Sequence, residues 1–201
     1  MTDKIPCTKC SELILPSTAE KTGGVCMACK QGVRESIEKS KEYYRKLKEY
    51  DPYRELWISL VKREIENGFD SLTKEEKIYF SVNVFDREVC NGGMDQFFWN
   101  SSGNFYAEVI EGLQLLNAEN SLLLLKQAAK ILFGEINPPK DRSLRWQALK
   151  EHSESLDSTN PDWSNELEKI DNKYYTDPDS LDELLTKFAE INGLVQPFKK
   201  S

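Results

Sequence analysis

Apolar residues recur every three or four positions along most of the chain after residue 50, which is the spacing of one face of an α-helix. The clearest stretches run from Leu56 to Ile65, from Ile78 to Val89 and over residues 119–133. Alternation typical of β-strands is confined to the cysteine-containing N-terminal segment. The pattern predicts an all-α, multi-helix globular domain over residues 51–198.

Capping and turn residues indicate where these helices begin and end. Asp51-Pro52 begins the first, and Thr73 with Glu76 three positions later forms a capping box that begins the second. The second helix is expected to end at Asn91-Gly92-Gly93. Further helices are expected over 104–117, 119–133, 162–175 and 179–192, with a shorter one over 144–149 and a polar turn over 153–161.

Residues 31–50 predict a charged connecting helix. Val33, Ile37, Tyr44 and Leu47 recur at heptad spacing, with Ser40 between them, and oppositely charged residues four apart support a helix. Three roles fit this pattern: a spacer, a short dimeric coiled coil, and a helix that lies on the main domain.

Residues 1–30 carry two cysteine pairs, Cys7-x2-Cys10 and Cys26-x2-Cys29, at the spacing of a four-thiolate zinc site. The segment between them, Ser11 to Val25, is expected to form a short hairpin. It has few apolar residues, so structural Zn²⁺ would contribute most of the folding free energy, on the order of 10 kcal/mol. We therefore expect a small zinc-ribbon-like knuckle with all four cysteines as ligands.

A disulfide framework is the alternative for these cysteines. Residues 1–6 contain no apolar run of the kind that begins a secretory signal, which favours a cytoplasmic protein with reduced thiols and a bound metal. No stretch approaches the about 20 apolar residues of a membrane helix, so no membrane contact is expected. The fifth cysteine, Cys90, is expected to be a small buried side chain.

Charge is distributed unevenly along the chain, whose net charge is −7. Residues 1–50 hold ten Lys/Arg against seven Asp/Glu, whereas residues 151–190 hold twelve acids against three lysines. An acidic surface repels DNA and attracts basic partners, although a solvated helix surface has the same composition. The candidate partner-binding acids are Glu154, Asp157, Asp162, Glu166, Glu168, Asp171, Asp179, Asp182 and Glu183.

An unusual stretch lies between the second and third predicted helices of the domain. It combines two glycines, adjacent aromatics, amides four positions apart and a small polar turn. One interpretation is a buried connector, with the amides bonded to loop backbone and the aromatics in the core. The other is a pocket in which the amides meet a ligand. The residues are Asn91, Gly92, Gly93, Gln96, Phe97, Phe98, Asn100, Ser101, Ser102 and Gly103.

This motif, in an acidic helical domain, resembles the DNA-mimic-protein-nineteen-like domain family, and the resemblance covers approximately residues 51–195. It implies an all-α domain, a homodimer, and acidic side chains that take the place of phosphates on the DNA-binding surface of a transcription factor. The cysteine pairs are an addition to the minimal domain.

Three functions follow. The first is a non-enzymatic acidic regulator that mimics DNA and occupies a basic nucleic-acid-binding protein, without direct DNA binding by the acidic domain. The second is a zinc-ribbon adaptor that binds nucleic acid or protein through residues 1–30. The third, an enzyme with a pocket near Asp95, Gln96 and Asn100, ranks last, because the chain has one histidine and no recognisable activated nucleophile or phosphate-binding loop.

Overall fold

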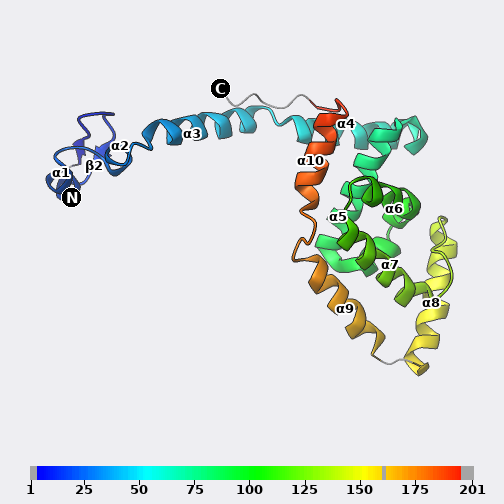
Figure 1. Ribbon diagram of the computed structural model, residues 1–201. Helices are drawn as coiled ribbons and strands as arrows, with labels where there is room; N and C mark the ends of the chain where they lie inside the picture. Colours follow the sequence, from blue (N-terminus) through cyan, green and yellow to red (C-terminus); the bar gives the residue numbers. More distant parts are fainter. Residues whose placement is uncertain (1–3, 160–161, 196–201) are drawn as a thin grey trace. The chain divides into compact units, whose positions relative to one another are not determined.

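The computed structural model describes residues 4–159 and 162–195. The chain divides into two compact units, one ending at Asp51 and one beginning at Pro52. The described residues are mostly helical, which confirms the predicted fold class (Figure 1). No helix among these residues has the length and apolar character needed to span a membrane.

The N-terminal unit begins with a two-stranded antiparallel hairpin, β1 (Ile5–Pro6) and β2 (Leu13–Ile14). Three helices follow: α1 (Pro16–Thr22), α2 (Met27–Lys30) and α3 (Arg34–Glu49).

The hairpin predicted between Ser11 and Val25 is therefore wrong, because α1 occupies that segment and the strands instead flank the first cysteine pair. Proline at the first position of α1 fits the helical backbone, and Gly23 ends the helix in the left-handed conformation at φ 68°.

The core of this unit is small. Its buried residues are Cys7, Ile14 and Cys26, with a few partly buried neighbours that include Cys10 and Cys29. Sulfur atoms thus occupy the places that apolar side chains fill in a larger domain. A core of this size cannot offset the conformational entropy of folding without a further contribution.

Helix α3 exposes the side chains of its predicted heptad. Val33, just before the helix, is 42% exposed, Ile37 36% and Tyr44 63%. The side chain of Leu47 lies outside the described residues. Ion pairs along the helix, such as Lys39 Nζ to Glu35 Oε1 at 2.9 Å, are of the expected kind. The choice among spacer, coiled coil and docked helix stays a prediction.

The second unit is a helical domain. Its elements are α4 (Pro52–Asn67), the short 3₁₀ helix η1 (Phe69–Ser71), α5 (Lys74–Trp99), the 3₁₀ helix η2 (Ser101–Phe105), α6 (Tyr106–Leu115), α7 (Glu119–Phe133), α8 (Arg142–Thr159), α9 (Trp163–Tyr174) and α10 (Leu181–Ile191).

Helix α5 lies at the centre of this unit, in contact with α4, α6, α7, α8, α9, α10 and η2 (Figure 1). The predicted capping box at its start is present, since Glu76 N donates to Thr73 Oγ1 and Thr73 N donates to Glu76 Oε2. Val82, Phe85 and Val89 on its apolar face are fully buried. Cys90 lies outside this apolar face and is exposed, so the prediction that it is buried is wrong.

The predicted interruption of this helix at the two glycines is also present. Gly92 (φ −160°, ψ 24°) and Gly93 (φ 81°, ψ 178°) leave the helical conformation, and the chain resumes as a short helical segment to Trp99. The backbone of Gly93 is in a region that is accessible essentially only to glycine.

Helix α8 is longer than predicted. It continues through residues 153–159, where a polar turn was expected. Polar residues are compatible with a solvent-exposed helix, and no glycine or proline interrupts the chain between Arg142 and Thr159. Thr159 is the last residue of the helix, and Asn160-Pro161, the predicted end of the polar turn, lies outside the described residues.

Candidate functional site

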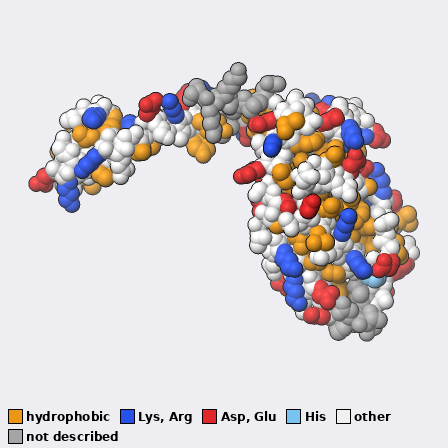
Figure 2. Space-filling view, viewed as in Figure 1, with side chains coloured by type: hydrophobic (Ala, Val, Ile, Leu, Met, Phe, Trp, Pro, Cys, Tyr) orange, Lys and Arg blue, Asp and Glu red, His pale blue; other side chains and the backbone are white. Residues whose placement is uncertain are grey.

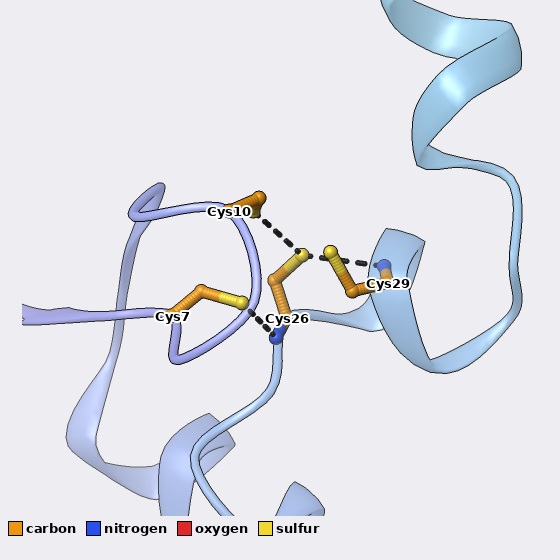
Figure 3. Close-up of side chains that lie close together, drawn as sticks. All are labelled: Cys7, Cys10, Cys26 and Cys29. Carbon is orange, nitrogen blue, oxygen red and sulfur yellow. Dashed lines mark hydrogen bonds between the residues drawn. The ribbon is translucent and has the colours of Figure 1, made fainter.

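The four cysteine sulfurs of the N-terminal unit converge on one point (Figure 3). All four Sγ atoms lie within 4.8 Å of one another, and the Sγ atoms of Cys10 and Cys26 are 3.7 Å apart. Thiolates at tetrahedral corners around zinc stand about 3.8 Å apart, given a Zn–S bond of about 2.3 Å. The described cysteines are free thiols and form no disulfides. Cys7, Cys10, Cys26 and Cys29 are thus positioned like a metal site.

Local backbone structure brings the two cysteine pairs together. The first pair lies in the turn between β1 and β2, where Cys7 N donates to Glu12 O at 2.8 Å. The second pair lies at the start of α2, where Cys26 is the N-cap residue and its Sγ accepts from Cys29 N at 3.3 Å. Thr8 N donates to Gly24 O at 3.0 Å and fastens one turn to the other.

Hydrogen bonds and burial make the thiols of Cys7, Cys26 and Cys29 unequal. Cys26 N donates to Cys7 Sγ at 3.1 Å, and this bond lowers the pKa of Cys7 to about 6. Arg34 Nη2 donates to Cys26 Sγ at 3.2 Å and, together with Cys29 N, lowers the pKa of Cys26. Burial and the neighbouring thiols of Cys10 and Cys26 raise the pKa of Cys29 to about 12. Zinc binds the thiolate form of cysteine, so binding at this cluster releases protons.

The motif predicted over Asn91–Gly103 is a connector that is buried in part: Gly93, Phe97, Phe98, Ser102 and Gly103 are buried, whereas Asn91, Gly92 and Ser101 are exposed. Phe97 and Phe98 are fully buried, and Ser102 Oγ donates to Phe97 O at 3.0 Å. Trp99, between the buried aromatics and the turn, is 36% exposed. The motif therefore contributes mainly to the core of the second unit.

The two amides of the motif share one side of the helix, as their spacing predicts. Gln96 Nε2 and Asn100 Nδ2 both donate to Glu88 Oε2, at 2.7 and 2.9 Å. Their partner is thus a carboxylate from the first part of α5, where loop backbone was expected. These amide N–H groups connect the two parts of α5 across the break at Gly92-Gly93, and their hydrogen bonds are made within the protein.

Arg145, which sequence analysis did not single out, is fully buried on α8. Its guanidinium donates from Nε to Phe98 O at 2.7 Å and from Nη2 to Asn100 O at 2.7 Å. Its Nη1 donates to Pro139 O and Lys140 O, both at 2.9 Å. These acceptors lie on two segments that are far apart in sequence, so no local pattern marks Arg145.

Two of the predicted partner-binding acids are engaged inside the second unit. Asp171 Oδ1 accepts from Met94 N at 2.8 Å, just after the glycine break. Asp179 accepts from Ser121 N at 2.6 Å and from the side chain of Asn120 at 2.8 Å, at the start of α7. Both carboxylates thus accept hydrogen bonds from backbone N–H groups at the starts of helical segments within the domain.

Their environments shift the two pKa values in opposite directions. Burial raises the pKa of Asp171, although the hydrogen bond from Met94 partly opposes it. Burial also disfavours the charged form of Asp179, but the hydrogen bonds from Ser121 and Asn120 outweigh it and hold its pKa below the usual range.

Most of the remaining predicted acids are exposed on α8, α9 and α10 or just before α9. On the face drawn in Figure 2, acidic side chains occur at many points of the second unit, with basic ones between them. The side chain of Asp157 lies outside the described residues. The exposed acids are Glu154, Asp162, Glu166, Glu168, Asp182 and Glu183.

Several of these acids make no ion pair, whereas many acids elsewhere on the protein do. Glu35 and Glu111, for example, pair with lysines at 2.9 and 3.1 Å. Among the described residues, no ion pair within 4.0 Å involves Glu154, Asp162, Glu168, Asp182 or Glu183.

A model of DMP19-like proteins matches residues 70–192, which is more than half of the chain. The chain belongs to the DMP19-like protein family. The match begins within η1 and ends just after α10, so it contains the Asn91–Gly103 motif and the exposed acids. The cysteine cluster of this DMP19-like protein lies outside the matched residues. The search of curated proteins and the search of solved structures found no match.

Family membership confirms the resemblance suggested by the motif. The DMP19-like family is not a known enzyme family. Of the structural residues that sequence analysis missed, Glu88 carries a weak sequence signal, since it lies only eight positions before Gln96. Arg145 carries none.

Proposed function

We propose that this DMP19-like protein is a non-enzymatic regulator that occupies the nucleic-acid-binding surface of a basic protein, such as a transcription factor. Its exposed carboxylates would take the place of DNA phosphates. Family membership supports this role, since the family implies DNA mimicry. The observation that carries the proposal is the set of exposed acids without ion pairs on the second unit.

A carboxylate without a cationic neighbour is available to the Lys and Arg residues of a partner. An acid already in an ion pair must give up that contact first, so it contributes less to binding. Glu154, Asp162, Glu168, Asp182 and Glu183 therefore form the proposed docking acids. Glu166 and Asp157 stay predictions, and Asp171 and Asp179 serve the fold.

Long-range electrostatics favour the same kind of partner. Residues 151–190 hold twelve acids against three lysines, so the segment attracts basic proteins and repels nucleic acid. Association should be fast at low ionic strength and should weaken as salt screens the attraction.

We further propose that the N-terminal unit binds one structural Zn²⁺ through Cys7, Cys10, Cys26 and Cys29. Four thiolates complete a tetrahedral zinc site, which leaves no position for a substrate. Zinc would supply folding energy that the small core of this unit lacks. The homodimer implied by the family stays a prediction.

Affinity capture from native lysate tests the regulator role. The full-length protein is immobilised, washed at low salt and eluted with competing duplex DNA. We expect a DNA-binding protein to be released by the duplex. A specific partner that stays bound through DNA competition would contradict mimicry.

The N-terminal unit favours a second role as an adaptor. It is a compact unit outside the family match, and Lys9, Lys21 and Lys30 are exposed on it. Direct titration with duplex DNA and with RNA at about 50 mM salt, where phosphate contacts are strong, tests nucleic-acid binding. Binding that is lost when the three lysines are changed to glutamine would support this role, and no binding would exclude nucleic acid as the ligand.

A further inference from the structure

Arg34 is the first residue of α3, and its side chain reaches the cysteine cluster. Nη2 donates to Cys26 Sγ at 3.2 Å, while Nη1 is 3.2 Å from Glu38 Oε1 and 3.5 Å from Glu12 Oε2. The side chain is only 21% exposed. Arg34 thus contacts a predicted metal ligand, the loop after the first cysteine pair, and the next turn of its own helix.

The charge of the cluster explains what such a residue contributes. Four thiolates around one Zn²⁺ carry a formal charge of −2, which is costly to hold in a partly buried site. A guanidinium that donates to one of the sulfurs offsets part of this charge and orients the ligand, as residues just outside the ligand shell do in other metal sites. The two carboxylates hold the guanidinium in place.

The start of α3 needs an anchor of this kind. Its N-cap residue, Val33, makes no side-chain capping bond. Val33 N donates to Ala28 O at 3.0 Å, which joins the start of α3 to the short helix that carries the second cysteine pair. Arg34 adds a side-chain connection to this single backbone connection.

We propose that Arg34 is a positioning residue for the metal cluster, which raises metal affinity through its N–H···S bond to Cys26 and fastens the start of α3 to the bound metal. This inference rests on the proposed zinc site. It assigns to Arg34 a role distinct from that of four other cations of α3, Lys39, Lys41, Arg45 and Lys46, which pair with carboxylates of the helix itself, as Arg45 does with Glu42.

Zinc affinity of the full-length protein, measured by competition with a chromophoric chelator, tests the proposal. Arg34→Gln removes the guanidinium, and Arg45→Gln on the same helix is the matched control. We expect Arg34→Gln to lower zinc affinity about tenfold or more, the size of effect seen for residues just outside the ligand shell. Arg45→Gln should leave the affinity unchanged.

A second variant covers the case in which Arg34→Gln prevents folding of the N-terminal unit. Glu38→Gln leaves the guanidinium in place but removes one of its two anchors, so a smaller loss of affinity is expected. With Co²⁺ as the probe, both variants should shift the thiolate-to-metal charge-transfer absorption, because the hydrogen bond to sulfur changes.

Hydrogen exchange at the first turn of α3 provides the remaining measurement. Chelation of zinc should deprotect these amides in the wild type, and Arg34→Gln should deprotect them even with zinc bound. Equal zinc affinity, charge-transfer absorption and protection in Arg34→Gln and wild type would overturn the role of Arg34 while leaving the zinc site intact. A wild type that binds no zinc would overturn both.

Discussion

Arg145 places a charged guanidinium in the interior of the second unit. It is fully buried, and its donors meet carbonyl oxygens at four positions instead of a carboxylate. Burial lowers the pKa of Arg145, although arginine remains charged at any physiological pH. Arg145 also explains why residue 103 is a glycine, since a side-chain carbon at Gly103 would lie 2.6 Å from Arg145 Nε.

We predict that Arg145→Met destabilises the second unit by about 3 kcal/mol or more, because four carbonyl groups each lose one hydrogen-bond donor in a buried environment. Arg142→Met is the matched control. Arg142 is exposed, stacks on Trp146 and makes one hydrogen bond, to Trp99 O at 3.3 Å, so its loss should cost less than about 1 kcal/mol. Urea unfolding measures both, and equal costs would contradict the account of Arg145.

Gly93 and Gly193 offer a second comparison at the scale of one residue. Both have positive φ, but a side-chain carbon at Gly93 would lie 2.5 Å from Asp171 Oδ2, whereas nothing lies within 4 Å at Gly193. We predict that Gly93→Ala costs more than about 3 kcal/mol, since it adds a clash to backbone strain. Gly193→Ala should cost about 1 to 2 kcal/mol from the backbone alone. Thermal unfolding of the two variants should rank them in this order, and the reverse order would be inconsistent with the packing of Asp171.

At the scale of elements, acids of the C-terminal part supply helix caps to earlier helices. Ala118, the N-cap residue of α7, makes no side-chain capping bond. Asp179, from the connection between α9 and α10, accepts from Asn120 N and Ser121 N instead. A negative charge here also interacts favourably with the helix dipole. The connection between two late helices therefore stabilises the start of an earlier one.

The lowered pKa of Asp179 predicts how stability depends on pH. Because the folded-state pKa lies below the unfolded value, this carboxylate stabilises the fold above the unfolded pKa of about 4. The contribution is lost as pH falls through the folded-state pKa. Asp179→Asn should thus cost about 1 kcal/mol at pH 7, and the cost should shrink below about pH 4. Urea unfolding across this range measures it, and an equal cost at pH 7 and pH 3 would be evidence against the charge contribution.

The sequence predicts most helices of the second unit because apolar spacing and capping residues are local signals. Thr73 with Glu76 and the Gly92-Gly93 break are examples. Local signals fail where polar residues are compatible with two structures, as in the second half of α8, and where a helix begins without a capping side chain, as α1 does after Leu15. They also cannot show that Glu88 accepts both motif amides or that Arg145 joins segments distant in sequence, because such contacts depend on the tertiary fold.

At the scale of the whole molecule, the two units differ in what stabilises them. The second unit has an extensive apolar core that includes Phe85, Phe97 and Phe98. The core of the N-terminal unit consists largely of the cysteine cluster. The two units should therefore respond differently to loss of metal.

We predict that a strong zinc chelator unfolds the N-terminal unit and leaves the second unit folded. Hydrogen exchange should show loss of protection over residues 5–30, while the unfolding temperature of the second unit stays unchanged. Cys26→Ser should have the same effect without chelator, and Cys90→Ser, at the exposed cysteine, should have none. Retention of full protection after metal removal would argue against a structural metal.

Charge is the property of the whole molecule that bears most directly on function. The proposed docking acids are surface residues without ion pairs, so their neutralisation should leave the apolar core and the helix caps intact. Substitution of the docking acids should therefore change binding without changing stability. A substitution at Asp171 or Asp179 would change the stability of the fold as well.

The central claim is best tested by binding of the captured DNA-binding protein to a variant with four substitutions, Glu154→Gln, Glu168→Gln, Asp182→Asn and Glu183→Gln. The control variant removes the same number of charges from acids in ion pairs: Glu55→Gln, Glu66→Gln, Glu111→Gln and Glu135→Gln. Isothermal titration at low salt should show at least a tenfold loss of affinity for the first variant and a much smaller loss for the control. Equal affinities for the two variants would contradict the claim that these carboxylates replace DNA phosphates.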